Sequence, residues 1–433
     1  MLFASALRST GSVVLAGSLI FFAASPVEAD QTRRDQWALN EMEVDKVWGI
    51  SQGEGVTVAV IDDGFDTQHQ DLRDNLLAGK DFVDGGSVDP AEGDLHGTDM
   101  ASIIAAHGHG PGGQDGIKGL APKSKILPIR QDLSSGWARS IRYAVDHGAS
   151  VINISAGSSG WDEKDAEAVS YALEKDVLVV TASGNEGRAE MIGYPGGYPG
   201  VLTVGATERS GEIWHKSNYG PEVLLVAPGV DTITPKAGSS GSSYHISNGT
   251  SNSAAYVSAA AALIRSEYPD LTAGQVVTRL TKTAGLPDSM EGSSLPDEKY
   301  GYGYIRPLAA LTEDIPAGSK YGPLEVPESL DSSSPEAEAG SGSGTDSSNT
   351  LKRILVFVVA PVFLLLVVGA TVFAIVRSSR RKKNAAPAGN GWHGELQGQQ
   401  PPYGQPMPPR GAGGFPPQQQ GPNQNQPSGP WGP

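Results

Sequence analysis

Short apolar runs alternate with helical patterns along the middle of the chain. Runs of four to seven mostly apolar residues are typical of buried strands, and they occur at residues 55–61, 125–129, 150–155, 176–181, 201–205 and 223–226. Helical periodicity occurs at residues 96–106, 137–147, 163–174 and 252–268. Strands that alternate with helices predict an α/β fold, in which helices flank a mostly parallel sheet on both faces.

Two longer apolar segments lie towards the two ends of the chain. Residues 11–24 follow Arg8 and precede small residues that end at Ala29, which indicates a secretory signal peptide over residues 1–29. Residues 354–376 form an uncharged stretch of 23 residues. As a helix this stretch would be about 35 Å long, enough to cross a bilayer core of roughly 30 Å. It is therefore predicted to be a transmembrane helix.

The charges that flank the second segment predict its orientation. Lys352 and Arg353 precede it, whereas five basic residues follow it between Arg377 and Lys383. Because the more basic flank usually stays in the cytoplasm, we expect a single-pass protein of the cell membrane. Its body would be extracellular, and its tail, residues 377–433, would be cytoplasmic.

Composition divides the remaining residues. Residues 30–311 have the apolar content of a folded domain, whereas residues 312–350 are rich in Pro, Ser, Gly and acidic residues, with Lys320 as the only basic residue. That composition predicts a flexible linker. The tail is rich in Pro, Gln and Gly, so we expect it to be disordered.

The chain has 433 residues, no cysteine and a formal net charge of −16. The lack of cysteine excludes disulfides, thiol catalysis and zinc–thiolate sites. The acidic balance argues against nucleic acid as a partner, because phosphate binding needs a basic surface. No cofactor or metal is expected: His107 and His109 are more typical of a loop than of a metal pair, and His69 is expected to be structural.

Three turns carry candidate chemistry. Asp62-Asp63-Gly64 follows the first predicted strand, His96-Gly97-Thr98 opens the first helix, and Gly249-Thr250-Ser251 opens the alanine-rich helix. Acyl transfer needs a nucleophile, a base and a carboxylate that orients the base. A serine in the first turn of a helix lies near unpaired backbone N–H groups, although Ser251 taken alone is more typical of a helix cap.

The turns stand within blocks that resemble the subtilisin-like serine protease (subtilase) family. The blocks are VAVIDDGFDTQHQDL at 58–72, HGTDMASIIAA at 96–106, VINISAGSSG at 151–160, VVTASGNEG at 179–187 and GYGYIRPLAAL at 301–311. The order Asp, His, Ser along the chain is also that of subtilisin. The resemblance covers about residues 47–311.

This resemblance implies a role for each matching residue. Ser251 is expected to be the nucleophile, His96 the general base and Asp62 the carboxylate that orients it. Asn185 is expected to donate a hydrogen bond to the oxyanion.

The resemblance also implies the substrate-binding residues. Ser155, Ala156 and Gly157 are expected to pair with the substrate backbone, and Ala182 and Gly184 to line the pocket for the residue before the scissile bond. The expected partner is therefore a protein or peptide substrate.

The chain departs from the family pattern near the catalytic motifs. Asp63 replaces a common Ser or Thr, Asp99 replaces a usual second histidine, and Ala255 replaces a usual proline after the nucleophile; Asn252 and Ser253 also differ. The kexin-like branch shares the Asp-Asp-Gly pattern, so a convertase that cuts after basic residues is an alternative.

The layout most resembles the mycosin group, which comprises membrane-anchored subtilases associated with type VII secretion. The lead-in between Ala29 and the first strand has only about 25 residues, too few for a folded prodomain. A linker, one membrane helix and a short tail follow the domain. A second hypothesis is structural: the domain stabilises a secretion complex, and proteolysis is secondary.

Overall fold

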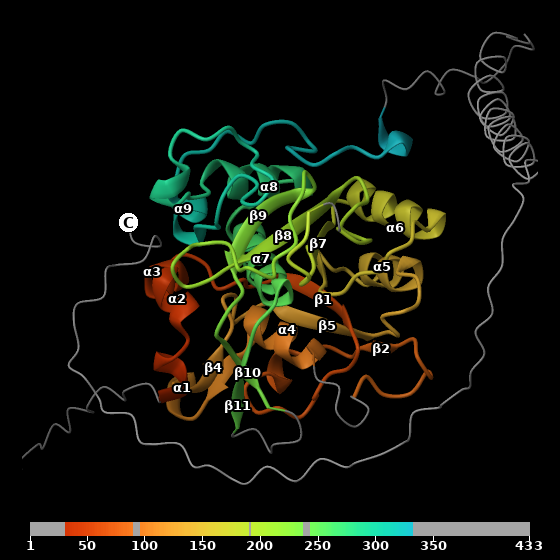
Figure 1. Ribbon diagram of the computed structural model, residues 1–433. Helices are drawn as coiled ribbons and strands as arrows, with labels where there is room; N and C mark the ends of the chain where they lie inside the picture. Colours follow the sequence, from red (N-terminus) through yellow and green to blue (C-terminus); the bar gives the residue numbers. More distant parts are fainter. Residues whose placement is uncertain (1–30, 90–95, 190–191, 237–242, 332–433) are drawn as a thin grey trace, which may run out of the picture. The chain divides into compact units, whose positions relative to one another are not determined.

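A computed structural model of the chain describes residues 31–89, 96–189, 192–236 and 243–331 (Figure 1). The predicted signal peptide, transmembrane helix and tail lie outside these ranges. Within them, no helix combines the length and the apolar character needed to span a bilayer.

The described domain is built on a seven-stranded sheet. The strand order is β2-β5-β1-β6-β7-β8-β9, and all neighbouring strands are parallel. The strands are β1 (Thr57–Asp62), β2 (Lys80–Asp81), β5 (Lys125–Arg130), β6 (Val151–Ile154), β7 (Leu178–Ala182), β8 (Val201–Thr207) and β9 (Val223–Pro228). Six of them lie on the predicted runs, whereas β2 is too short to show a pattern.

Helices cover both faces of the sheet, and alternate side chains of the strands show why. In β1, Val58 and Val60 belong to one apolar cluster, and Ala59 and Ile61 to the other. The first cluster includes residues of α4 (His96–Ala105), α7 (Thr250–Glu267), α8 (Ala273–Lys282) and α9 (Pro307–Thr312); the second includes residues of α5 (Ala138–Asp146) and α6 (Glu163–Glu174). The predicted α/β fold is confirmed.

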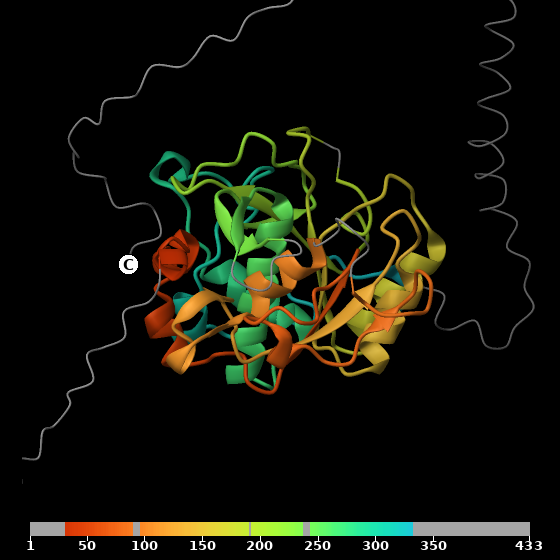
Figure 2. The same cartoon turned by 90° about the horizontal axis from the view of Figure 1, so that it is seen from below.

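Helix α7 is central to this arrangement. Residues Thr250 to Arg265 are all buried, and the helix contacts α4 and strands β6 to β9. Figure 2 shows α7 in green next to α4 in orange. Most of its side chains are small, so its neighbours can approach closely. The helix begins two residues before the predicted start, which places Ser251 in its first turn.

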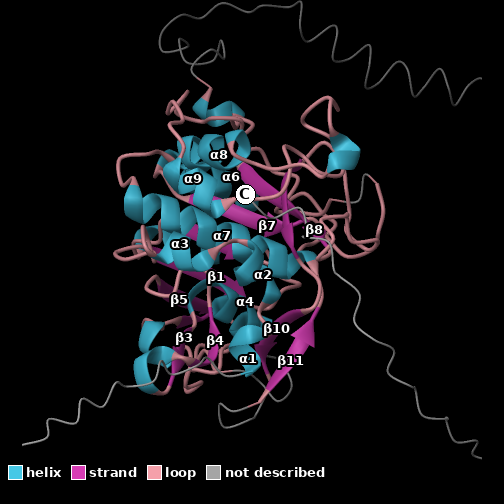
Figure 3. Ribbon diagram, turned by 90° about the vertical axis from the view of Figure 1, so that its left-hand side faces the viewer, coloured by secondary structure: helices cyan, strands magenta, loops and turns pink. Residues whose placement is uncertain are grey.

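Several short elements escape the apolar pattern. The lead-in forms α1 (Gln31–Arg34), α2 (Trp37–Glu41) and α3 (Val44–Trp48), and two antiparallel hairpins join β3 (His107–His109) to β4 (Asp115–Lys118) and β10 (Thr232–Pro235) to β11 (Tyr244–Ser247). Figure 3 shows β10 and β11 next to α4, and α4 contacts β10.

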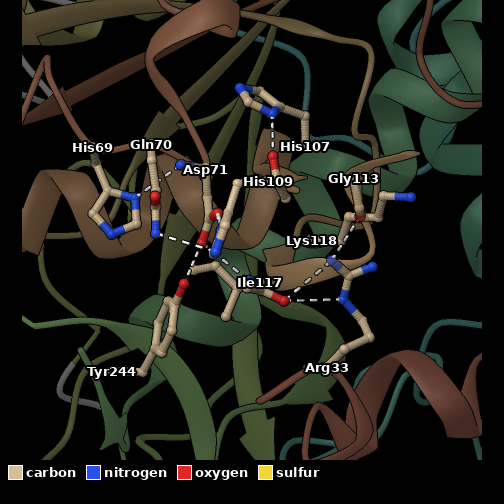
Figure 4. Close-up of polar contacts among 12 residues, drawn as sticks. Arg33, His69, Gln70, Asp71, His107, His109, Gly113, Ile117, Lys118 and Tyr244 are labelled. Carbon is tan, nitrogen blue, oxygen red and sulfur yellow. Dashed lines mark hydrogen bonds and ion pairs between the residues drawn. The ribbon is translucent and has the colours of Figure 1, made fainter. Parts of the chain in front are cut away.

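The buried carboxylate of Asp71 ties both hairpins to the loop after β1 (Figure 4). It accepts hydrogen bonds from Nδ1 of His109, from the N–H of Ile117 at 3.0 Å and from the hydroxyl of Tyr244 at 2.7 Å. Nδ1 of His69, which is 1% exposed, accepts the N–H of Asp71. His69 and His109 thus have structural contacts, as predicted for His69.

The packed domain extends beyond Leu311, where the sequence predicted its end. Leu324 is 4% exposed and belongs to the first apolar cluster, and Thr272 Oγ1 donates to the carbonyl of Lys320. The Pro, Ser and Gly content of this stretch conceals its few apolar anchors. The domain therefore reaches at least the last described residue of this stretch, Asp331.

Candidate active site

Asp62 and His96 form a hydrogen-bonded pair. Asp62 is the last residue of β1 and is fully buried, and His96 is the first residue of α4. Nδ1 of His96 lies 2.9 Å and 3.0 Å from the two carboxylate oxygens of Asp62. An ionised carboxylate only accepts hydrogen bonds, so Nδ1 carries the proton. In the neutral ring, Nε2 is then free to accept one.

The charges around His96 favour its protonated form. Burial lowers the pKa of the imidazole, but the negative charge of Asp62 and its hydrogen bond outweigh burial; with smaller contributions from Asp63 and Asp99, the pKa is raised to about 9. Because a protonated imidazole cannot accept a proton, His96 becomes a base as the pH rises through this value.

Ser251 lies in the first turn of α7 and is 8% exposed. Its hydroxyl donates to the carbonyl oxygen of Ser155 at 3.1 Å, just beyond the end of β6. Among the described residues, no hydrogen bond joins this hydroxyl to His96, although α4 and α7 are in contact. In catalytic sites, the hydrogen bond between nucleophile and base is often long or incomplete until substrate binds.

Asn185 follows β7, and Thr250 fixes the orientation of its amide. The Oδ1 atom of Asn185 accepts the backbone N–H of Thr250 at 2.9 Å and its hydroxyl at 3.0 Å. The NH₂ group is therefore left for another acceptor. The predicted role of Asn185 therefore depends on the orientation that Thr250 imposes. Thr250 belongs to the Gly-Thr-Ser turn, but the sequence does not indicate that it orients Asn185.

The donors of Asn185 and Ser251 converge beside Gly249. A Cβ atom built on Gly249 would lie 3.5 Å from Nδ2 of Asn185 and 3.7 Å from the backbone nitrogen of Ser251. In the first turn of a helix, such an N–H has no partner within the helix. The space beside Gly249 can therefore hold one oxygen atom between two donors.

A cavity of about 290 Å³ lies next to these donors. All five predicted substrate-binding residues line it together with the predicted oxyanion donor and nucleophile: Ser155, Ala156, Gly157, Ala182, Gly184, Asn185 and Ser251. Glu186 and Asn218, which were not predicted, also line it and are hydrogen-bonded to each other. Asp62 and His96 are not among the lining residues.

Parallel topology explains why these residues gather. β1, β6 and β7 are neighbours in the sheet, and Asp62, Ser155 and Ala182 lie at or just beyond their carboxyl ends. In such sheets ligands bind outside these ends. Among the hydrogen bonds of the described residues, none uses the backbone of Ala156 or Gly157, so both can pair with an extended peptide.

Asp63 and Asp99, two departures from the family pattern, have different contacts. Asp63 Oδ1 accepts the N–H of Gly97 at 3.2 Å, which satisfies a free donor in the first turn of α4. Asp99 lies one turn after His96, and its Oδ2 is 3.5 Å from Nε2 of His245. Nothing in the sequence pattern indicates this second pair.

Comparison with known proteins agrees with the family resemblance of the sequence motifs. The model of the Subtilase family matches residues 53–303, more than half of the chain. A thermophilic serine proteinase of Bacillus sp. is 37% identical over 230 residues, which cover 52% of this chain and 55% of that protein. The chain thus spans about half the length of this relative. Mycosin-1 of Mycolicibacterium smegmatis is 32% identical over 351 residues, which cover 67% of this chain and 76% of that protein.

A solved structure agrees with these sequence relatives. The crystal structure of MycP1 from the ESX-1 type VII secretion system is 31% identical with a TM-score of 0.57, and the match covers 70% of this chain and 91% of that chain. The chain belongs to the subtilase family of serine peptidases, and its described domain has the subtilisin-like fold.

Proposed function

We propose that this chain is a membrane-anchored serine endopeptidase that cleaves exported proteins outside the cytoplasm. One observation supports this above the others. His96 is hydrogen-bonded to the buried Asp62 at the carboxyl end of β1. Ser251 and Asn185 line a cavity at the carboxyl ends of the neighbouring strands. This set can supply a nucleophile, a base, a carboxylate and an oxyanion donor to one peptide bond.

The acylation step follows from these positions. Ser251 Oγ turns from the carbonyl of Ser155, loses its proton to Nε2 of His96 and bonds to the substrate carbonyl carbon. The electron pair of the C=O bond moves to oxygen, which accepts hydrogen bonds from Nδ2 of Asn185 and the N–H of Ser251. When the C–N bond breaks, His96 returns the proton to the leaving nitrogen.

Deacylation reverses these roles with water. His96 takes a proton from a water molecule, whose oxygen attacks the acyl carbon, and then returns the proton to Ser251 Oγ as the ester bond breaks. The carboxylate of Asp62 stabilises the imidazolium form of His96 during both steps, in line with the raised pKa of that ring.

The nucleophile is tested by changing Ser251→Ala. We expect peptide hydrolysis and labelling by a fluorophosphonate to be lost with little change in thermal stability. Ser253→Ala is the matched control, because Ser253 lies in the same turn of α7 and its hydroxyl donates to the carbonyl of Ala227 at 2.9 Å. Labelling that persists in the Ser251→Ala protein would refute the assignment.

The location rests on the two apolar segments described above. Residues 1–29 serve in this proposal as a cleaved export signal, and residues 354–376 as the membrane anchor, with the domain outside and residues 377–433 inside. External protease added to intact cells should digest the domain and spare an epitope at the C-terminus. Protection of the domain instead would contradict this topology.

Similarity to a protein of the type VII secretion system supports a role beside that machinery. MycP1 is described as coming from such a system, and this chain is 32% identical to Mycosin-1. Two functions are then open, cleavage of exported proteins or stabilisation of a secretion complex. If Ser251→Ala cells secrete normally while cells lacking the whole protein do not, stabilisation is the main function.

A kexin-like preference for basic residues is the remaining alternative. Asp63, the residue that suggests this alternative, already has partners within the domain. Its carboxylate accepts the N–H of Gly97, and the backbone carbonyl of Asp63 accepts a hydrogen bond from Nε of Arg130 at 3.2 Å. A peptide library that shows no preference for Arg or Lys before the cleaved bond would exclude a convertase.

A further inference from the structure

A second carboxylate–imidazole pair joins α4, which carries His96, to β11, which precedes Ser251 in the chain. Asp99 lies in α4, three residues after His96, and His245 lies in β11, six residues before Ser251. Nε2 of His245 is 3.5 Å from Oδ2 of Asp99 and 3.4 Å from the hydroxyl of Thr234 in β10. The pair thus connects the helix that carries the base to the strand that leads to the nucleophile.

The carboxylate of this pair is buried, whereas the imidazole reaches solvent. The Asp99 side chain is 10% exposed and that of His245 41%. Oδ1 of Asp99 is buried and has no hydrogen-bond partner among the described residues. A buried carboxylate without a counter-charge is costly, so protonated His245 is its natural partner.

Asp99 acts on both histidines. Its hydrogen bond to His245 and its negative charge raise the pKa of His245, and its charge also raises the pKa of His96. In turn, burial raises the pKa of Asp99, while His245 and His96 both lower it. The two imidazoles therefore share the field of one carboxylate.

Four other described residues act on the pair. From β10, Thr234 and the carbonyl of Pro235 contact it, and Lys236, just after β10, opposes protonation of His245. The negative charge of Asp99 also favours protonation of His69, which lies in the loop after β1. Of these, only His69 is an imidazole, and burial lowers its pKa.

We infer that Asp99 and His245 are positioning residues of the reaction. The pair holds β11 and α4 together, and protonated His245 offsets the charge that Asp99 directs at His96. This inference rests on the proposed peptidase function. Neither residue needs to touch the substrate, and the pair adjusts the pH range, determined mainly by Asp62, in which His96 can act as a base.

Two substitutions with opposite effects test this inference. Asp99→Asn removes a negative charge near His96, and His245→Gln leaves that charge without its counter-ion. Tyr244→Phe is the matched control, because it removes the neighbouring contact of β11 with Asp71 and leaves Asp99 and His245 intact. The rate of fluorophosphonate labelling and kcat/KM for a peptide are measured on the full chain, from about pH 5 to about pH 10.

We expect the rising limb of both profiles to move in opposite directions. Asp99→Asn should move its midpoint to lower pH by roughly half a unit to one unit, and His245→Gln should move it to higher pH by a similar amount. The double variant should match Asp99→Asn, because no charge is left to offset. Tyr244→Phe should leave the midpoint in place.

Each remaining outcome has a distinct meaning. Shifts in one direction in all three single variants, or no shift in any, would overturn the inference while the peptidase function stands. If Asp99→Asn does not fold, the exposed His245→Gln still decides, because the inference then requires its shift to higher pH. A wild-type chain that neither labels at Ser251 nor cleaves peptides would remove the proposed function, and the inference with it.

Discussion

The amide oxygen of Asn185 accepts two hydrogen bonds from Thr250, whereas its amide nitrogen has no acceptor among the described residues, and this asymmetry predicts its contribution. Asn185→Leu should lower kcat about 10² to 10³-fold, with little effect on KM, because the lost donor acts on charge that develops only in the transition state. Thr250→Val should cause a smaller loss, since the backbone N–H of Thr250 still orients the amide. A rise in KM with unchanged kcat would contradict the oxyanion role.

Gly249 tests the same space from the other side. Its backbone is extended, so alanine brings no backbone strain, but the added methyl group would lie 3.5 Å from Nδ2 of Asn185. Gly249→Ala should therefore lower kcat by roughly tenfold, about 1.4 kcal/mol in the barrier, without lowering the melting temperature. Steady-state kinetics and thermal unfolding of one preparation check both parts. Unchanged kcat would place the oxyanion elsewhere.

The Asp62–His96 pair predicts a particular pH dependence. The pKa of His96 is raised to about 9, so kcat/KM should increase as the pH rises through that value and the ring loses its proton. Asp62→Asn should move this limb to lower pH, because the negative charge that holds the proton is removed. It should also lower kcat by about 10⁴-fold, because the amide no longer selects the Nδ1–H tautomer. A limb that does not move would show that another group controls it.

At the scale of elements, burial decided what the sequence could predict. Strands such as β6 and β7 are buried on both faces and are mostly apolar, whereas β11 is largely exposed and has no apolar run. The Asp, His and Ser motifs lie at the ends of predictable elements, and their proposed roles come from the family resemblance. The contacts of Thr250 with Asn185 and of Asp99 with His245 join distant segments, which periodicity cannot reveal.

The stretch after Leu311 shows the same limit, and Gly274 in α8 provides its test. A Cβ on Gly274 would lie 2.0 Å from the backbone of Tyr321. Alanine in a helix normally stabilises it by about 1 kcal/mol relative to glycine, but overpacking against backbone costs about 1–3 kcal/mol. Gly274→Ala should therefore lower the melting temperature and expose residues 313–331 to proteolysis.

Gly160→Ala is the control for this substitution, because a Cβ on Gly160 meets no atom within 4 Å. It should leave the melting temperature and the proteolysis pattern unchanged. A Gly274→Ala protein that is more stable than wild type would show that residues 313–331 do not pack on α8.

At the scale of the whole molecule, chemistry and anchoring belong to separate parts of the sequence. The proposed catalytic residues all lie between Asp62 and Ser251, and the predicted membrane helix occupies residues 354–376. Among the described residues, those that line the cavity all lie between Ser155 and Ser251. Removal of the anchor should therefore change where the enzyme is found without changing what it does to a soluble peptide.

A chain that ends at Thr350 tests this separation. It keeps the packed stretch through Asp331 and loses the apolar segment, so it should appear in the culture medium with the same kcat/KM as the full chain in detergent. Full-length protein should sediment with membranes and resist extraction at alkaline pH. If the shortened chain also stays with the membrane, the anchor is the N-terminal segment at residues 11–24, and the export signal is not removed.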